Sequence, residues 1–420
     1  MSAPTPEAQG TTEVVAPQAD TIAETLREAW RGWLQRLRAG DLGALPIFVG
    51  LAALAVLFSA LDDSFYTERN FVNLLLQTAG VATIAIGVVF VLLIAEIDLS
   101  VGFVSGVCAV IMTLLLRPEE QNFPWWAAIG AALIITTCIG LLQGLIITKG
   151  RVPSFVVTLA GYLTWGGVVL ILTTEASSAG TIRIQDDVAL GIANDYLPDV
   201  WGWVLLGALL AAYLLLELAK VRARRERGVA HRPLVLILLQ LVAIGIIGAF
   251  AVWYANKDRG VPVVALIVGV FLVFWTFVAN RTRFGRHVYA VGGNPEAARR
   301  AGINVDRIRI AVFMISAFMA GVGGIILASR LRSVDPGVGG GQLLLNAIAA
   351  AVIGGTSLFG GHGRVISALL GAAVIATVAN GMDLLSLAAG WKFVITGGVL
   401  LAAVLVDAFA KRARQASGVG

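Results

Sequence analysis

Long apolar segments alternate with short polar ones along almost the whole chain. Runs at 127–147, 234–253 and 261–278 have close to the length, about 20 residues, that an apolar helix needs to cross a bilayer. The pattern predicts twelve such helices, at 45–61, 74–95, 99–116, 125–147, 154–173, 201–219, 233–253, 261–279, 309–329, 343–358, 364–383 and 391–409. The sequence therefore predicts an all-α polytopic membrane protein.

Basic residues form five clusters between or outside the predicted helices. Four, two, two and four predicted helices separate consecutive clusters, so all five can face the same side. Because Lys and Arg mark cytoplasmic loops, this pattern places both termini in the cytoplasm. It also explains the net charge of +5 without any nucleic-acid partner. The clusters lie at 27–38, 149–151, 220–232, 281–309 and 411–414.

The ends of the chain differ in composition from its middle. Residues 1–25 are rich in Ala, Pro, Thr, Glu and Gln, and residues 21–38 then place apolar side chains at helical spacing among arginines. We expect 1–44 to be a cytoplasmic tail, first disordered and then an amphipathic helix. Residues 45–410 form the predicted transmembrane domain, and 411–420 form a basic cytoplasmic tail.

A polar segment at 280–309 interrupts the apolar pattern and carries seven arginines. Its middle has the boundary signals of a short helix, with an N-cap, a proline at the first position, a following glutamate and a glycine stop. We expect this helix to contact a partner protein. The alternative is a solvated loop whose arginines only set topology. The residues are Asn294, Pro295, Glu296, Ala297, Ala298, Arg299, Arg300, Ala301 and Gly302.

The sequence predicts that the helices are interrupted at two places within the apolar region. Glu96, Asp98 and Ser100 lie between two apolar runs, where Asp98 can cap the following helix. Near the C-terminal end, Gly354 and Gly355 begin a segment denser in glycine than helix packing requires. We expect a break or tight turn at both places, a feature that transporters use to line a pathway.

Polar and aromatic side chains within predicted spans are candidates for a substrate pathway. A sugar needs neutral hydrogen-bonding groups together with aromatic faces. Phe155, Thr158, Tyr162 and Trp165 recur at one helical face, and Gln77 and Asn346 lie in other spans. Ordinary helix packing is the alternative interpretation for all six.

Several kinds of chemistry are absent from the sequence. No G-x-x-x-x-G-K-[ST] phosphate loop occurs, so this chain is not expected to hydrolyse ATP by that route. The three histidines, His231, His287 and His362, are scattered, and Cys108 and Cys138 lie within apolar segments. An embedded enzyme, a metal site and a disulfide framework are therefore disfavoured, and no cofactor is expected in this chain.

One long polar connection is acidic and falls on the predicted outer side. The segment 174–200 has five acidic residues and a single arginine, Arg183. It is either a landing surface for another protein or a plain solvated loop.

Four segments resemble the permease subunits of ribose- and xylose-type ABC sugar importers. They are AEIDLSVG at 95–102, KGRVPSFVVTLAGYLTW at 149–165, FGRHVYAVGGNPEAARRAGINVDRIRI at 284–310 and LLNAIAAAVIGGTSLFGGHGR at 344–364. The likeness runs in order over roughly 71–407. Ala95-Glu96 replaces the Gly-Gly that is commoner in the family, which is similar to the xylose-type branch.

The resemblance implies a family core of about ten spans, with a further pair near 201–253. It implies a homodimeric or pseudo-symmetric channel in the cytoplasmic membrane of a prokaryote, importing xylose or a similar monosaccharide. An extracytoplasmic sugar-binding protein would deliver the sugar, and a separate cytoplasmic ATPase would bind ATP and Mg. Residues 294–302 would be the coupling helix that docks on this ATPase.

Two other functions remain open at this stage. The same broad permease group includes importers of nucleosides and branched-chain amino acids. An ion-coupled secondary transporter would need titrating carboxylates within the membrane, for which Glu96, Asp98 and Asp383 are the candidates.

Overall fold

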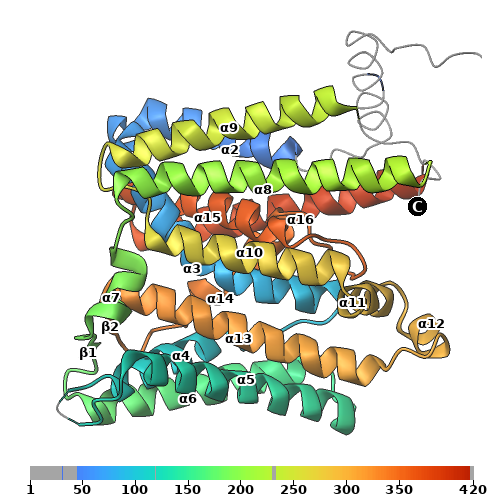
Figure 1. Ribbon diagram of the computed structural model, residues 1–420. Helices are drawn as coiled ribbons and strands as arrows, with labels where there is room; N and C mark the ends of the chain where they lie inside the picture. Colours follow the sequence, from blue (N-terminus) through green and yellow to red (C-terminus); the bar gives the residue numbers. More distant parts are fainter. Residues whose placement is uncertain (1–30, 32–44, 119, 229–232, 417–420) are drawn as a thin grey trace, which may run out of the picture. The chain divides into compact units, whose positions relative to one another are not determined.

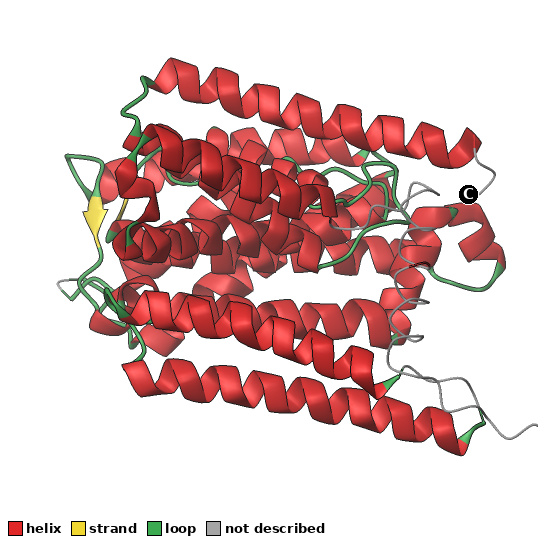
Figure 2. Cartoon of the chain, turned by 90° about the horizontal axis from the view of Figure 1, so that it is seen from above, coloured by secondary structure: helices red, strands yellow, loops and turns green. Residues whose placement is uncertain are grey.

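The computed structural model describes residues 31, 45–118, 120–228 and 233–416, and most of them are helical (Figures 1 and 2). The predicted tail and amphipathic helix at 1–44 lie outside the described residues, apart from Arg31. The only strands in the described part are two short ones, β1 (Ile182–Arg183) and β2 (Ser333–Val334), which pair in antiparallel fashion.

Each of the twelve predicted segments coincides with a helix. They are α2 (Leu45–Leu61), α3 (Glu68–Leu93), α4 (Val101–Leu115), α5 (Trp125–Gly150), α6 (Ser154–Ala176), α8 (Asp199–Glu226), α9 (Leu234–Asn256), α10 (Val263–Arg281), α13 (Val305–Leu331), α14 (Gln342–Ile353), α15 (Ile366–Leu384) and α16 (Ala389–Ala416). A 3₁₀ turn, η1 (Asp63–Tyr66), precedes α3, and three more helices lie in connections: α7 (Asp187–Asn194), α11 (Arg283–Gly293) and α12 (Pro295–Arg300).

Eight of these helices are long and apolar enough to cross a membrane, as judged over the described residues, and α2, α4 and α14 are shorter apolar helices. The chain is thus a mostly helical, polytopic membrane protein. The predicted span 343–358 was too long, because α14 ends at Ile353. Its 12 residues extend about 18 Å, less than the hydrocarbon core of a bilayer.

Two other predicted segments contain more helix than the sequence pattern indicated. The segment 280–309 is not an open loop with one short helix, since α11 occupies most of its first half. Thr282 caps α11 by accepting a hydrogen bond from Gly285 N at 3.1 Å. At the C-terminal end, α16 continues to Ala416, so part of the predicted tail is helical.

The described chain divides into two compact units. One contains the described residues of 209–246, which are the adjoining halves of α8 and α9. The other contains the described residues of 45–208 and 247–416 and holds the candidate site described below.

The core of the larger unit forms around α3 and α13, which contact each other. Helix α13 also contacts α4 and α5, while α3 contacts α10, α14 and α15. Glycines bring these backbones close together: a Cβ on Gly324 would lie 2.0 Å from the Ser105 carbonyl oxygen, and one on Gly371 would lie 1.8 Å from that of Ala350. Small residues of this kind let membrane helices approach closely.

The two ends of the larger unit carry different connections (Figure 1). Helices α11 and α12 lie at one end, and β1, β2 and α7 lie at the other. At the β1–β2 end, Ser329 Oγ of α13 accepts a hydrogen bond from Ala193 N at 2.9 Å. Asn194 Nδ2 donates to the Ser329 carbonyl at 2.7 Å. This end is therefore fixed to the core through α7.

Candidate functional site

Helix α12 has the local structure that its sequence predicted. Asn294 Oδ1 accepts a hydrogen bond from Ala297 N at 3.0 Å, and Pro295 occupies the first helical position. The chain leaves the helix through Gly302, whose φ of +84° lies in the left-handed region. No heavy atom outside its chain neighbours lies within 4 Å of a Cβ built on Gly302. Glycine is thus required there by backbone conformation and not by space.

One face of α12 is exposed and the other is anchored. Glu296, Arg299 and Arg300 are exposed, whereas Ala298 is buried. The Ala298 carbonyl accepts from Ile303 N at 3.0 Å, and Asn304 then caps α13 by accepting from Arg307 N at 3.0 Å. Because only a short, hydrogen-bonded turn separates α12 from α13, displacement of α12 is expected to move the start of α13.

The first predicted break lies between α3 and α4 and is built around Asp98, a buried residue. Asp98 Oδ1 accepts from Ser100 N at 3.0 Å and from Ser100 Oγ at 2.6 Å. Its Oδ2 accepts from Ser316 Oγ, on α13, at 2.8 Å. The Ser100 hydroxyl also lies 3.1 Å from Gln143 Oε1 on α5. Asp98 therefore links Ser100, the N-cap residue of α4, to α13, and Ser100 extends this link to α5. The prediction that Asp98 caps α4 was wrong in detail, because Asp98 binds Ser100 N and no side chain caps the first turn of α4.

The second break, after α14, begins at the two glycines that were predicted to form it. Gly354 follows the end of α14, and Gly355 has a φ of +94°. Further along, Gly361 N donates to the Leu93 carbonyl at the end of α3, at 2.9 Å. The two breaks therefore meet at the end of α3.

Helix α11 is joined to the second break. Tyr289 donates its hydroxyl to the Gly363 carbonyl at 2.8 Å, and burial raises the pKa of this phenol above its ordinary value. A Cβ on Gly292 would lie 1.7 Å from the Leu93 carbonyl oxygen. The helix before α12 thus packs directly where α3 ends.

The six predicted pathway residues have different environments. Phe155 is exposed, Thr158 is buried, and Gln77 is half-buried on α3. Tyr162 packs on Phe103 of α4, with ring centroids 4.7 Å apart, and its hydroxyl lies 3.4 Å from Gly341 N. The structure thus brings Tyr162, one turn before Trp165, against α4 and the entry to α14.

Buried polar atoms without a hydrogen-bond partner are found beside the same elements. In the described chain these include Trp165 Nε1 on α6, Asn346 Oδ1 on α14 and Gln143 Nε2 on α5. A Cβ on Gly161 would lie 2.5 Å from Gln143 Nε2 and 3.5 Å from Trp165 Nε1, so both atoms border this glycine. Groups of this kind suit a neutral hydroxylated molecule.

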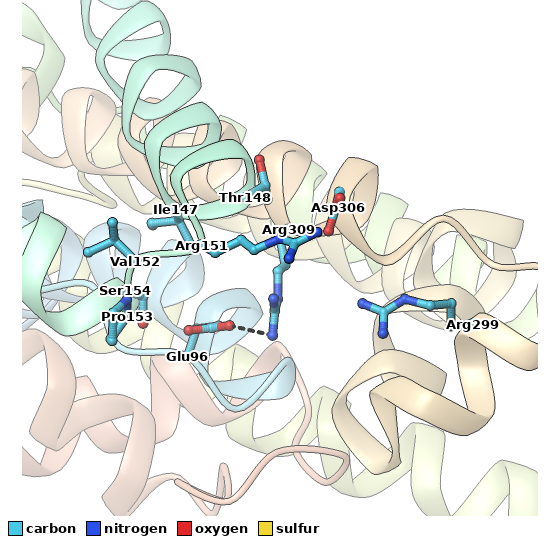
Figure 3. A pocket seen from close by; sticks show the side chains of 10 residues that line it. All are labelled: Glu96, Ile147, Thr148, Arg151, Val152, Pro153, Ser154, Arg299, Asp306 and Arg309. Atoms are coloured by element: carbon cyan, nitrogen blue, oxygen red, sulfur yellow. Dashed lines mark ion pairs between the residues drawn. The ribbon is translucent and has the colours of Figure 1, made fainter.

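A cavity of about 670 Å³ lies beside α12 (Figure 3). Residues from the first break, the α5–α6 connection, α12 and the start of α13 line it. Glu96 and Arg309 form an ion pair across it, with Glu96 Oε1 2.9 Å from Arg309 Nη2. The lining residues are Glu96, Ile147, Thr148, Arg151, Val152, Pro153, Ser154, Arg299, Asp306 and Arg309.

The end with β1 and β2 is less acidic than the sequence suggested. Asp186 serves as the N-cap of α7, accepting from Ala189 N at 2.8 Å. Arginines from elsewhere in the chain join this end, because Arg332 follows α13 and Arg259 lies over the Tyr196 ring at 4.9 Å. Any partner that docks there would therefore meet charges of both signs.

Sequence reasoning missed the functional candidates that depend on distant contacts. Arg309 and Ser316 were not selected, and Glu96 was interpreted as part of a break or as a carboxylate for ion coupling, without a partner. The available signal was the lone glutamate before an apolar helix, since a carboxylate there needs a cation or hydrogen-bond donors. Nothing in the sequence identified Arg309 as its partner, 213 residues further along the chain.

The chain is similar to known transport permeases over most of its length. The family model for the permease component of branched-chain amino acid transport systems matches residues 70–404. The xylose transport system permease XylH of Haemophilus influenzae is 34% identical over 381 residues, covering 90% of this chain and 99% of that protein.

Two further relatives are similar to most of the chain. XylH of Escherichia coli K12 is 35% identical over 383 residues, covering 91% of this chain and 95% of that protein. The ribose import permease RbsC of the same strain is 32% identical over 360 residues, covering 86% and 92%. No solved structure matches the chain.

Proposed function

This chain belongs to the family of permease components of branched-chain amino acid transport systems, and from that premise we propose that it imports a monosaccharide, with xylose or a similar pentose favoured. It is a transport subunit and not an enzyme. The observation that carries the choice of sugar is the 34–35% identity to xylose permeases over 90–91% of the chain.

The proposed assembly is an ABC importer in the cytoplasmic membrane of a prokaryote. Two copies of this chain would form the channel, surrounded by lipid, with twelve apolar helices each and both termini in the cytoplasm. A separate ATPase would bind ATP and Mg, and an extracytoplasmic sugar-binding protein would deliver the sugar. The distribution of basic clusters supports this orientation, because the end with α11 and α12 also carries Arg151 and Arg309.

In this assembly α12 would be the coupling helix. Its support is the exposed charged face, the fixed caps and the short turn to α13. When the ATPase pair closes on ATP, α12 would move with it and carry the start of α13. Both helix breaks lie close to α11 or α13, so this motion would change which side of the pathway is open.

Reconstitution in proteoliposomes with the ATPase and the sugar-binding protein tests this function. We expect radiolabelled xylose to accumulate only with ATP, and accumulation to persist when ion gradients are collapsed. Labelled leucine is the main competing substrate to test, because the chain's family is that of branched-chain amino acid permeases. ATP-dependent leucine uptake without xylose uptake would overturn the sugar assignment, and gradient-driven uptake without ATP would overturn the ABC assignment.

Combining Gly302→Val with Glu296→Arg is expected to lower ATP-dependent uptake by about tenfold or more while membrane insertion stays normal. Valine resists the left-handed conformation at Gly302, and arginine reverses a charge at the exposed first turn of α12. Gly228→Val is the matched control, since Gly228 is also exposed and has a φ of +63°. Apart from its chain neighbours, no heavy atom of the described residues lies within 4 Å of its Cβ position. Normal coupled uptake by the double variant would contradict the role of α12.

A further inference from the structure

Helix α13 contacts the first break at two points that lie on one helical face. Arg309 pairs with Glu96, and Ser316 donates to Asp98. The two α13 residues are seven positions apart, two helical turns, and their partners are two positions apart in the break. A rigid shift of α13 would therefore act on both contacts together.

The Glu96–Arg309 pair is only partly shielded from solvent. Their side chains are 13% and 28% exposed, and the Arg309 Nε has no hydrogen-bond partner in the described chain. A pair in this setting is stronger than a surface ion pair, yet it separates without opening a tightly packed core. The 2.9 Å contact with Nη2 is therefore well suited to forming and breaking.

Other charged groups on the cavity walls provide alternative partners. Arg151 and Arg299 line the cavity with Glu96, and Asp306 lies three residues before Arg309 on α13 (Figure 3). Positions three apart on a helix are neighbours, so Arg309 can turn to Asp306 when Glu96 moves away. Partner exchange would leave neither charge isolated, and two discrete arrangements of the same groups are what a switch requires.

We infer that the Glu96–Arg309 ion pair is a latch for transport: it holds the first break against α13 and releases it when α12 and α13 move. This role rests on the proposed import function and deepens it. The latch lies in the wall of the cavity beside α12, and Asp98 joins the same break to α5 through Ser100. A displacement of α12 would thereby be transmitted to the buried break between α3 and α4 through the Glu96–Arg309 ion pair.

The test uses the complete importer in proteoliposomes, with radiolabelled xylose as the probe, and measures xylose taken up per ATP hydrolysed. Glu96→Gln should lower this ratio about tenfold while ATP hydrolysis continues. The exchanged pair, Glu96→Arg with Arg309→Glu, keeps opposite charges at the two sites and should restore the ratio to within about threefold of the unsubstituted complex. Recovery by exchange would not follow from a role in packing alone.

Glu68→Gln is the matched control, because Glu68 forms an ion pair with Lys257 at 3.5 Å at the other end of α3. It should leave the ratio unchanged. Size-exclusion of each variant in detergent measures folded protein, and the exchanged pair decides the outcome if Glu96→Gln alone lowers its amount. An unchanged ratio in Glu96→Gln, or a folded exchanged pair without recovery, would overturn the latch alone. Absence of xylose uptake by the unsubstituted complex would overturn the proposed function itself.

Discussion

Gly324→Ala is expected to destabilise the protein by roughly 3 kcal/mol, at the upper end of the usual overpacking penalty. A Cβ at this position would lie 2.0 Å from the Ser105 carbonyl oxygen and 2.7 Å from its carbon. Both atoms belong to the backbone of α4, so no side-chain rotation can make room. The added methyl group must instead separate α13 from α4 and weaken the contacts that both helices make with α5.

Thermal unfolding in detergent, followed by fluorescence-detected size exclusion, measures this effect. Gly130→Ala is the matched control, a glycine in the second turn of α5 with no heavy atom of the described residues, other than its helix backbone and chain neighbours, within 4 Å of its Cβ position. Alanine favours a helix over glycine by about 1 kcal/mol, so this variant should be as stable as the unsubstituted protein or slightly more so. Equal stability of the two variants would show that α13 and α4 do not meet through Gly324.

Asp98→Ala is expected to cost about 3 kcal/mol of stability, because it leaves Ser100 N and Ser316 Oγ buried without their acceptor. Asp98→Asn should cost less, since its amide keeps one oxygen for Ser100 and can donate to Ser316 Oγ. The amount of folded protein should therefore decrease in the order unsubstituted, Asn, Ala. Sugar preference should not change.

Folded yield and competition uptake assays on the same membranes test this order. Asp199→Ala is the control, an exposed aspartate in the first turn of α8 whose loss should change stability by less than about 0.5 kcal/mol. A stable Asp98→Ala protein with altered sugar preference would instead place Asp98 in the pathway.

The sequence predicted the long helices well because each needs only its own apolar run. It failed where glycine decides the outcome. The segment 343–358 is apolar almost throughout. The helix nevertheless ends at Ile353, before the apolar run does, and the backbone turns at Gly355 with a φ of +94°. Helix α11 was missed because glycines and arginines interrupt it. Its buried positions Gly285, Val288 and Gly292 do follow helical spacing, and that weak signal was present.

The candidate site divides in the same way. The caps of α12 could be predicted because an N-cap, a proline and a glycine stop act within one turn of chain. The partners of Glu96 and Asp98 could not, because Arg309 and Ser316 come into contact with them only after α13 packs against α3 and α4. Hydrophobic periodicity indicates which face of a helix is buried but not which distant residue it meets.

The central position of α3 has a consequence for how the protein is made. Most of α3 is buried, against α10, α13, α14 and α15, all of which are synthesised long after it. Its Asn70 forms two hydrogen bonds with Asn380 of α15, at 2.9 and 2.8 Å. In the break after α3, Asp98 accepts from Ser316 of α13, so this bond forms only after α13 has been synthesised. A nascent chain that has reached α9 therefore holds polar groups in the membrane without their final partners. A chain that stalls or is truncated before α13 should therefore be degraded by membrane proteases. The helices from α13 onward decide whether the newly made protein is stable.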